Sequence, residues 1–376
     1  MKTYHAESAR AGLQAAAAAG LPWDEFCLVA TELLARAIPH DSVCLGTADP
    51  ASRMLTGRVK VNMGSDESQR MTVDETAFMH YEYGVPDYNH FAELADRPIA
   101  VSILAEATED QPMQSPRYRD LLSAGGLTQE LRGVVRSDGA MWGFYTLYRQ
   151  AGQSGFSPAE ADFMHRIESI LAAGVRRGLI ASTVTGQVPA GTSAAVVIFD
   201  GTGAVLSATP TAEERIAELG GDLWSQLPAP VTAVRVACAA ASRGIGHHVP
   251  ALRIRSRSGE WLSLHAAPIR DRDGRTDQIA VTIETAGAAK IIPLIVAAYG
   301  LTDRERDVVQ QVLEGASTNQ IAAHLHLSPY TIQDHLKTIF DKVGVASRRE
   351  LSSQIFFGQY AARMGDNLDS TGWFAG

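Results

Sequence analysis

The sequence predicts a multidomain chain in which two α+β domains, each built on antiparallel strands with helices, precede an all-α domain of four helices. Its 376 residues exceed the usual length of one domain, so two or three domains are expected. Two stretches carry short alternating apolar segments bounded by turn residues, as strands do, whereas the last stretch has the three- and four-residue spacing of helices. The predicted ranges are 21–182 and 193–285 for the α+β domains, 286–300 for a connecting segment and 301–362 for the helical domain.

The first α+β domain is predicted to begin and end with a helix. Residues 23–37 have helical spacing of apolar side chains, and Pro39 closes that helix. The last two strands are joined by the turn Ser137-Asp138-Gly139, and a helix opens at Ser157-Pro158. The predicted strands are 42–47, 55–61, 100–104, 129–135 and 142–148, with a long loop between the second and third.

Residues 142–175 resemble the end of a GAF domain, in which the last strand passes to a helix through an F-S/T-x-x-E turn, here Phe156 to Glu160. The resemblance implies a sensor domain that holds a small molecule, such as a cyclic nucleotide or a tetrapyrrole, between the sheet and the middle loop. The sequence identifies no cofactor. Aromatic packing under a long loop is the alternative explanation for the residues that are candidates to line the pocket. These are Phe78, His80, Tyr81, Tyr83, Tyr88, His90 and Phe91.

The second α+β domain is smaller. Its predicted strands are 195–200, 204–207, 251–257, 261–268 and 278–284, and the alternation in LRIRSRSGEWLSLHAAPI indicates a half-buried antiparallel hairpin. The order of strand, turn, helix and then three strands resembles a PAS domain. The segment 183–192, rich in small residues, is predicted to separate the two α+β domains. The apolar segment 286–300 is expected to form a connecting helix from Pro293 that packs on a partner chain or within its own chain.

Three helix-start signals follow one another between Leu301 and Leu351. Thr302 and Glu305 have the spacing of a capping box, and Gly315 supplies the left-handed position that ends the first helix. A short second helix is predicted from Thr318, and Ser328-Pro329 start a third that runs to about Val343. Two helices joined by so short a turn cross steeply, which suits a helix-turn-helix that places its second helix in the major groove of DNA.

This segment resembles the LuxR-type (NarL-type) C-terminal domain. The family pattern LTxRE matches 301–305, G-x-S/T-x-x-x-I-A-x-x-L matches 315–325, L-S-x-x-T-V/I-x-x-H-L matches 327–336, and K-x-G-V-x-S-R-x-E-L matches 342–351. The resemblance implies that Gln333, Asp334 and Lys337 face base edges. It also implies that Asn319, Thr331, His335 and Arg348 lie near phosphates.

Asp334 departs from what charge alone favours on a surface that faces phosphates. One hypothesis is that its carboxylate accepts a hydrogen bond from a cytosine amino group, which would make it a specificity residue. The alternative is a surface charge paired with Lys337 one turn away.

Composition restricts the remaining possibilities. The formal net charge of −9 means that only a local surface can bind DNA, which argues against a histone-like protein. The cysteines Cys27, Cys44 and Cys238 have no metal-ligand spacing and suit buried thiols, so no metal site is expected. No apolar run approaches the ~20 residues of a membrane span, so a cytoplasmic protein that does not enter the membrane is expected. No catalytic motif is present, and none of the residues is assigned a catalytic role.

Three functions compete at this point. A transcription regulator that senses a small molecule or partner is favoured, and it is expected to bind double-stranded DNA as a homodimer and to contact RNA polymerase. A sigma-like RNA polymerase subunit is the alternative, but it requires a second helical DNA-reading domain. An enzyme with an accessory DNA-binding domain is the third possibility. Pairing of the last helix through Leu351, Ile355 and Phe356 would bring two reading helices onto successive turns of DNA, although packing within one chain explains these residues too.

Overall fold

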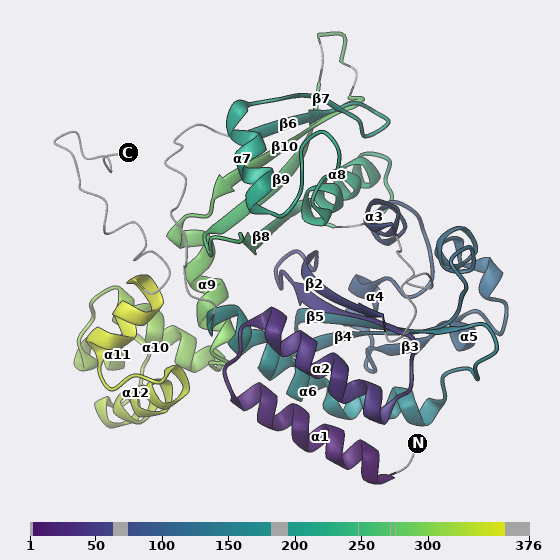
Figure 1. Ribbon diagram of the computed structural model, residues 1–376. Coiled ribbons are helices and arrows are strands. Elements are labelled where there is room, and N and C mark those ends of the chain that lie inside the picture. The colour runs from purple at the N-terminus through teal and green to yellow at the C-terminus, as the bar shows by residue number, and fades with distance from the viewer. Residues whose placement is uncertain are drawn as a thin grey trace. The chain divides into compact units, whose positions relative to one another are not determined.

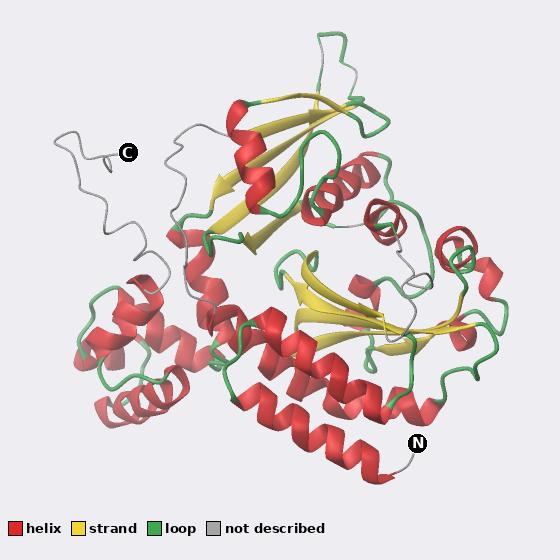
Figure 2. Ribbon diagram, viewed as in Figure 1, coloured by secondary structure: helices red, strands yellow, loops and turns green. Residues whose placement is uncertain are grey.

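The computed structural model describes residues 3–62, 74–181, 195–246, 248–270, 272–274 and 276–357. These residues divide into two compact units. The N-terminal unit contains the two sheets, and the C-terminal unit contains the helices that follow Ala286 together with the short segment Ser258–Glu260 (Figures 1 and 2). The predicted order of two antiparallel sheets with helices followed by a helical domain is therefore confirmed.

The first sheet is antiparallel throughout and has the strand order β2-β1-β5-β4-β3. Asp138 and Gly139 adopt φ angles of 53° and 75°, so the predicted turn between the last two strands is present. The third strand is shorter than predicted, because the chain becomes helical at Leu104. The strands are β1 Ser42–Ala48, β2 Leu55–Asn62, β3 Val101–Ile103, β4 Leu127–Ser137 and β5 Ala140–Gln150.

Three helices, α1 Thr3–Ala18, α2 Trp23–Ala37 and α6 Pro158–Ala181, pack together, and α2 and α6 contact the first sheet (Figure 1). The helices at 23–37 and from Pro158 were predicted, but α1 was not. Its buried residues Ala6, Ala9, Leu13 and Ala17 recur at three- and four-residue spacing. This stripe is mostly alanine, which buries little apolar area, and the pattern is therefore weak in the sequence.

The segment between the second and third strands was predicted as a long loop, but its described part, residues 74–100, contains two helices, α3 and α4. Asp74 caps α3 by accepting from the backbone N–H groups of Thr76 and Ala77, as a short polar residue at this position commonly does. These helices are α3 Glu75–Tyr83 and α4 Phe91–Asp96, and between β3 and β4 follow α5 Leu104–Ala107, a 3-10 turn at Pro112–Gln114 and a π turn at Tyr118–Leu122.

The second sheet repeats the topology of the first, with the order β7-β6-β10-β9-β8 and antiparallel pairing. Arg255 pairs with Trp261 where the predicted hairpin turns. Two helices, rather than the one predicted, contact this sheet. The elements are β6 Ala195–Phe199, β7 Val205–Ala208, α7 Pro210–Glu218, α8 Ala229–Ser242, β8 Ala251–Arg255, β9 Trp261–Ile269 and β10 Gln278–Thr285.

The two sheets of the N-terminal unit share one hydrophobic core. A single cluster of buried side chains contains Phe78 and Phe144 from the first region together with Val236 and Val281 from the second. Helices α3 and α8 pack closely, since a Cβ atom on Gly84 would lie 2.9 Å from Val236 Cγ1. The two predicted α+β regions are thus continuous in their packing.

A buried ion pair also joins the two regions. Asp49, after β1, accepts from the backbone N–H of Arg253 in β8 at 2.7 Å and from its Nε and Nη2 atoms at 2.9 and 2.5 Å. The predicted linker 183–192 lies outside the described residues.

The connecting helix α9, Ala288–Ala298, begins five residues before Pro293, where it was predicted to start. Proline inside a helix removes one hydrogen bond, but Ile291, Leu294 and Ile295 are buried around it, and burial of these side chains outweighs the lost bond. The remaining helices are α10 Asp303–Leu313, α11 Thr318–His324, α12 Pro329–Val343 and α13 Arg348–Ser352, followed by a π turn at Ser353–Phe357.

Candidate nucleic-acid interface

Side-chain caps fix the start of each of the three central helices. Thr302 and Glu305 form the predicted capping box on α10, and Ser317 and Gln320 form another on α11. Ser328 Oγ accepts from the backbone N–H of Thr331 at 3.1 Å to cap α12. Each cap satisfies N–H groups that have no partner inside the helix, so the sequence specifies where each helix begins.

The turn between α11 and α12 is short. His326 adopts φ 55°, a left-handed conformation that is uncommon outside glycine, and Leu327 N–H donates to Ala322 carbonyl oxygen at 2.9 Å. The chain therefore reverses within four residues, from Leu325 to Ser328. This is the helix-turn-helix geometry that the sequence predicts.

Three cations hold α10, α11 and α12 together. Lys342 Nζ donates to Glu305 Oε2 at 2.6 Å, which ties the end of α12 to the start of α10. Arg304 Nη2 donates to the Leu325 carbonyl at 2.6 Å and so caps the end of α11. Arg348 Nη1 and Nη2 donate at 2.8 Å to the Ala316 carbonyl and to Thr318 Oγ1. The arrangement of the helices thus depends on polar contacts as well as on the core.

The electrostatic environment of Glu305 reflects these contacts. Burial alone would raise the pKa of its carboxyl, but hydrogen bonds from Lys342 and from the Thr302 backbone outweigh burial and lower the pKa below its ordinary value. Glu305 is therefore ionised at neutral pH and fully engaged within the domain.

One face of α12 is free of such contacts. Tyr330 is 74% exposed, and Gln333, Asp334 and Lys337 are exposed on the same face. The opposite face is buried in the core of the C-terminal unit through Ile332, Leu336, Ile339 and Val343. The helix is thus anchored along one side and presents a polar row on the other.

Charge on this row is available to a partner. In the described part of the chain, no ion pair joins Asp334 to Lys337, and the Lys337 ammonium group makes no hydrogen bond or ion pair. Residues 301–357 contain six Lys and Arg against seven Asp and Glu side chains, so general positive charge does not explain attraction to DNA. Affinity must come from the placement of a few cations.

The other predicted contact residues occupy different surroundings. Asn319 is exposed on α11, whereas Thr331 and His335 are half-buried on α12. The Thr331 hydroxyl lies 2.8 Å from Ser328 Oγ. Arg348 is half-buried, and its guanidinium donates within the domain, while its neighbour Arg349 is exposed. Burial thus distinguishes two arginines that are adjacent in the sequence.

Comparison with known proteins identifies this part of the chain. Residues 300–354 match the family model described as bacterial regulatory proteins, luxR family. They form a LuxR-type helix-turn-helix domain. A helix-turn-helix-type transcriptional regulator from Mycobacterium bovis is 51% identical over 51 residues, which are 14% of this chain and 6% of that protein. The transcriptional regulatory protein UhpA from Escherichia coli is 40% identical over 58 residues, or 15% of this chain and 30% of UhpA.

The similarity to these relatives concerns the LuxR-type domain, since the chain spans 6% and 30% of their lengths. Among solved structures, Escherichia coli SdiA aligns with 88% of this chain and 89% of its own at 12% identity and a TM-score of 0.27. The Vibrio cholera VqmA–ligand–DNA complex aligns with 46% and 84% at 18% identity and a TM-score of 0.21. Scores this low do not establish a common overall arrangement.

In the N-terminal unit, the seven residues predicted to line a ligand pocket have different surroundings. Phe78, Tyr83 and Phe91 are buried in the core. His80 is exposed, while the Tyr81 and Tyr88 hydroxyls donate to Asp120 and Gln114 at 3.2 and 2.7 Å. His90 is buried beside α4. The seven residues therefore do not line one cavity.

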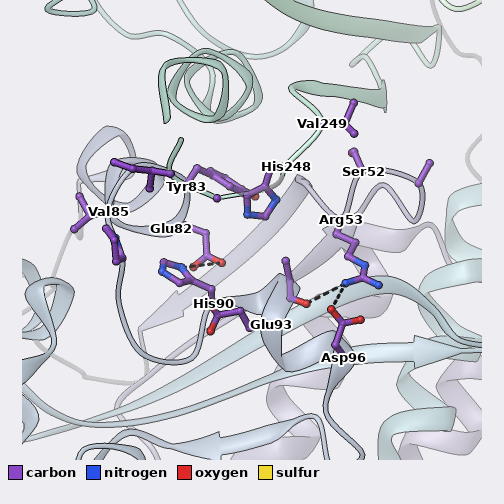
Figure 3. A pocket seen from close by; sticks show the side chains of 15 residues that line it. Ser52, Arg53, Glu82, Tyr83, Val85, His90, Glu93, Asp96, His248 and Val249 are labelled. Carbon is purple, nitrogen blue, oxygen red and sulfur yellow. Dashed lines mark hydrogen bonds and ion pairs between the residues drawn. The ribbon is translucent and has the colours of Figure 1, made fainter. Parts of the chain in front are cut away.

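Two of them, Tyr83 and His90, do line a pocket of about 400 Å³ in the N-terminal unit (Figure 3). Its wall comes from the turn after β1, the end of α3, the start of α4 and the segment between α8 and β8. This last segment belongs to the second sheet region, and no sequence pattern predicts that it contacts α3 and α4.

Other sites are not indicated by the described residues. No cluster of three or more His, Cys, Asp or Glu side chains suited to a metal occurs among them. Burial raises the pKa of the Cys27, Cys44 and Cys238 thiols, which keeps them protonated and unreactive. Within the described part of the chain, no helix is long and apolar enough to cross a membrane.

Proposed function

We propose that the chain is a sequence-specific DNA-binding transcription regulator that reads DNA with α12. The observation that carries the proposal is the row Gln333, Asp334 and Lys337, exposed on a helix whose other face is anchored in a LuxR-type domain. A recognition helix enters the major groove and reads base edges with such side chains. A sigma-like subunit would need a second helical DNA-reading domain, and the described N-terminal unit is built on two sheets instead.

Two neighbouring arginines in α13 are proposed to have different roles in DNA binding. Arg348 positions α11 and α13 through its contacts with Ala316 and Thr318, and Asn319, Thr331 and His335 border the reading face. Exposed Arg349 is free to meet the phosphate backbone. Phosphate contacts of this kind set register and orientation on the duplex.

The regulator is proposed to act as a homodimer that recruits or blocks RNA polymerase. Leu351 and Ile355 are buried in the core of their own domain, which favours the interpretation that they pack within one chain. Pairing through the last helix must then use its exposed side. Two copies bound to DNA would read half-sites about one helical turn apart.

The N-terminal unit is proposed to sense a small molecule or partner through GAF-like and PAS-like regions. Support comes from the strand order of the two antiparallel sheets. When the strands of each region are numbered along the chain, both sheets have the order 2-1-5-4-3. Support also comes from the Phe156-to-Glu160 turn, where Ser157 N–H and Oγ donate to Glu160 Oε2 at 2.8 and 2.9 Å.

Footprinting of the purified full-length protein on DNA upstream of its own and neighbouring genes tests the proposal. We expect a protected site of about two helical turns whose affinity falls steeply with salt. Gln333→Ala and Lys337→Ala weaken protection, whereas Gln310→Ala, exposed on α10, leaves it unchanged. Absence of a footprint at every salt concentration would contradict DNA binding by this helix.

Asp334→Ala tests the specificity role of the carboxylate. If Asp334 accepts from a cytosine amino group, its loss reduces the preference for the operator over random DNA by about 1–3 kcal/mol. Non-specific binding should stay equal or become tighter, because a negative charge near phosphates is removed. Equal weakening on operator and random duplex would show that Asp334 has no role in base selection.

A further inference from the structure

One large side chain on the exposed face of α12 has no role so far. Tyr330 is 74% exposed, and it makes no hydrogen bond, ion pair or ring contact within the described part of the chain. Among the side chains described in the C-terminal unit, it is the one large apolar group that is exposed. Single exposed apolar side chains are common on protein surfaces, so the position of Tyr330 decides whether the ring has a function.

Tyr330 lies on the same side of α12 as the residues proposed to read DNA. Tyr330, Gln333, Asp334 and Lys337 have the spacing i, i+3, i+4 and i+7, which places them on one side of a helix. All four are exposed, and they are called the reading row below. A recognition helix contacts base edges through the residues near its N-terminus, and Tyr330 is the second residue of α12.

The backbone that carries Tyr330 is held in place. Ser328 Oγ accepts from Thr331 N–H at 3.1 Å, and the Ser328 carbonyl oxygen accepts from Ile332 N–H at 3.1 Å. The Ile332 side chain is buried in the core of the C-terminal unit. Because tyrosine has two rotatable side-chain bonds, ordering its ring against a partner from this fixed backbone costs little entropy.

Charge does not explain how the reading row binds DNA. The row carries one cation, Lys337, and one anion, Asp334, so its formal charge is zero. Attraction to phosphates therefore supplies little of the affinity along this row. Contacts with the bases, including apolar ones, must contribute instead.

The chemistry of tyrosine selects the groups that it contacts. The apolar group that base pairs present in the major groove is the C5-methyl group of thymine. The hydroxyl at the far end of the ring is a hydrogen-bond donor, and phosphate oxygens accept hydrogen bonds from tyrosine in protein–DNA complexes. One tyrosine can therefore contact a base and the backbone at the same time.

We propose that Tyr330 is a further base-contacting residue, whose ring packs against the C5-methyl group of a thymine in the major groove and whose hydroxyl donates to a phosphate. The inference rests on the proposed binding of DNA by α12. It adds a preference for thymine at one position of each half-site.

Replacement of thymine by uracil tests the methyl contact, because it removes the methyl group and keeps the base pair. In the duplex that the footprint defines, each thymine is replaced by deoxyuridine in turn. The Kd of the full-length chain is then measured by fluorescence anisotropy. We expect one thymine position in each half-site at which the replacement weakens binding about fourfold.

Variants assign this effect to Tyr330. Tyr330→Ala should bind the thymine operator about tenfold more weakly and should no longer distinguish thymine from uracil at this position. Tyr330→Phe keeps the ring and therefore the discrimination, but without the hydroxyl it should bind operator and random duplex more weakly by about the same factor. Tyr4→Ala removes a tyrosine that is 81% exposed on α1, and this matched control should bind like the unmodified chain. Circular dichroism checks the folding of each variant.

The inference is overturned if no thymine responds to replacement by uracil, if Tyr330→Ala keeps the affinity of the unmodified chain, or if Tyr330→Ala still distinguishes the two bases. A Tyr330→Phe chain of unchanged affinity would overturn the phosphate contact. In each of these cases the footprint of the unmodified chain remains, so the proposed DNA binding is retained. A chain that gives no footprint on any DNA would overturn the proposed function and the role of Tyr330 together.

Discussion

Glu305 shows how one side chain links a helix start to the placement of the reading helix. Its Oε2 atom accepts from the Thr302 backbone N–H and from Lys342 Nζ, at 2.7 and 2.6 Å. The first contact closes the capping box of α10 and the second fixes the end of α12. The family pattern contains both residues, but only the structure shows that they touch.

This contact predicts a pH dependence of the C-terminal unit. Because the folded state lowers the pKa of Glu305, the ionised carboxylate stabilises the fold above its ordinary pKa of about 4.3. That contribution is lost as the pH falls from there through the lower pKa of the folded state. Glu305→Gln should therefore cost about 1–2 kcal/mol at pH 7 and progressively less below pH ~4.

Hydrogen exchange of α10 and α12 amides, compared between variant and unmodified chain at each pH, measures this difference. Asp341→Asn, exposed on α12, is the control and should show no such trend. A Glu305→Gln deficit that stays constant down to pH 3 would mean that the carboxylate charge does not stabilise the domain.

Residue roles were predictable where they follow from local sequence. The caps Thr302, Ser317 and Ser328 accept from amides three positions away, so spacing alone reveals them. The partners of Arg348 and Lys342 lie 30 or more positions away, and no local pattern encodes such contacts. The same limit applies to the pocket, whose lining residues come from segments separated by more than a hundred positions.

At the scale of elements, the start of α12 depends on one side chain, Ser328, so a single substitution there should destabilise the helix. Ser328 Oγ satisfies the Thr331 amide, and Pro329 at the first helical position has no amide to satisfy. Ser328→Ala should destabilise the C-terminal unit by about 1 kcal/mol, whereas Ser328→Asp, which retains a capping oxygen, should cost little.

Exchange protection of the first turn of α12 measures the effect. Ser353→Ala, an exposed position in the last turn, serves as control. If Ser328→Ala and Ser328→Asp lose equal protection, the cap is not what holds the start of the helix.

Elements with strong apolar periodicity or turn chemistry were predicted well, whereas α1, α3, α4 and α5 were not predicted and the start of α9 was misplaced. The strands of both sheets and helices α2, α6, α10 and α12 carry such signals. Helix α1 depends on an alanine stripe, and α9 tolerates an internal proline because of its packing. In both cases tertiary burial, rather than local preference, decides the structure.

At the scale of the whole molecule, the shared core of the two sheet regions has consequences for stability. Buried residues of both regions form one cluster, and the Asp49–Arg253 pair lies between them with side chains 3% and 15% exposed. Regions that bury apolar surface against each other unfold together, whereas regions joined only by a linker unfold separately. The sequence suggested two α+β domains, and it contained no signal for their common core.

Calorimetry of the full-length chain should therefore show two transitions, one for the N-terminal unit and one for the C-terminal unit. Asp49→Ala removes the carboxylate that accepts three hydrogen bonds from Arg253 and should lower the stability of the first transition as a whole by about 1–3 kcal/mol. Asp96→Ala breaks the exposed pair with Arg53, in which the Asp96 side chain is 67% exposed, and should cost no more than about 1 kcal/mol. Two results would mean that each sheet region is stable without the other. One is three unfolding transitions in the unmodified chain, and the other is a first transition that splits in Asp49→Ala so that only one part moves to lower temperature.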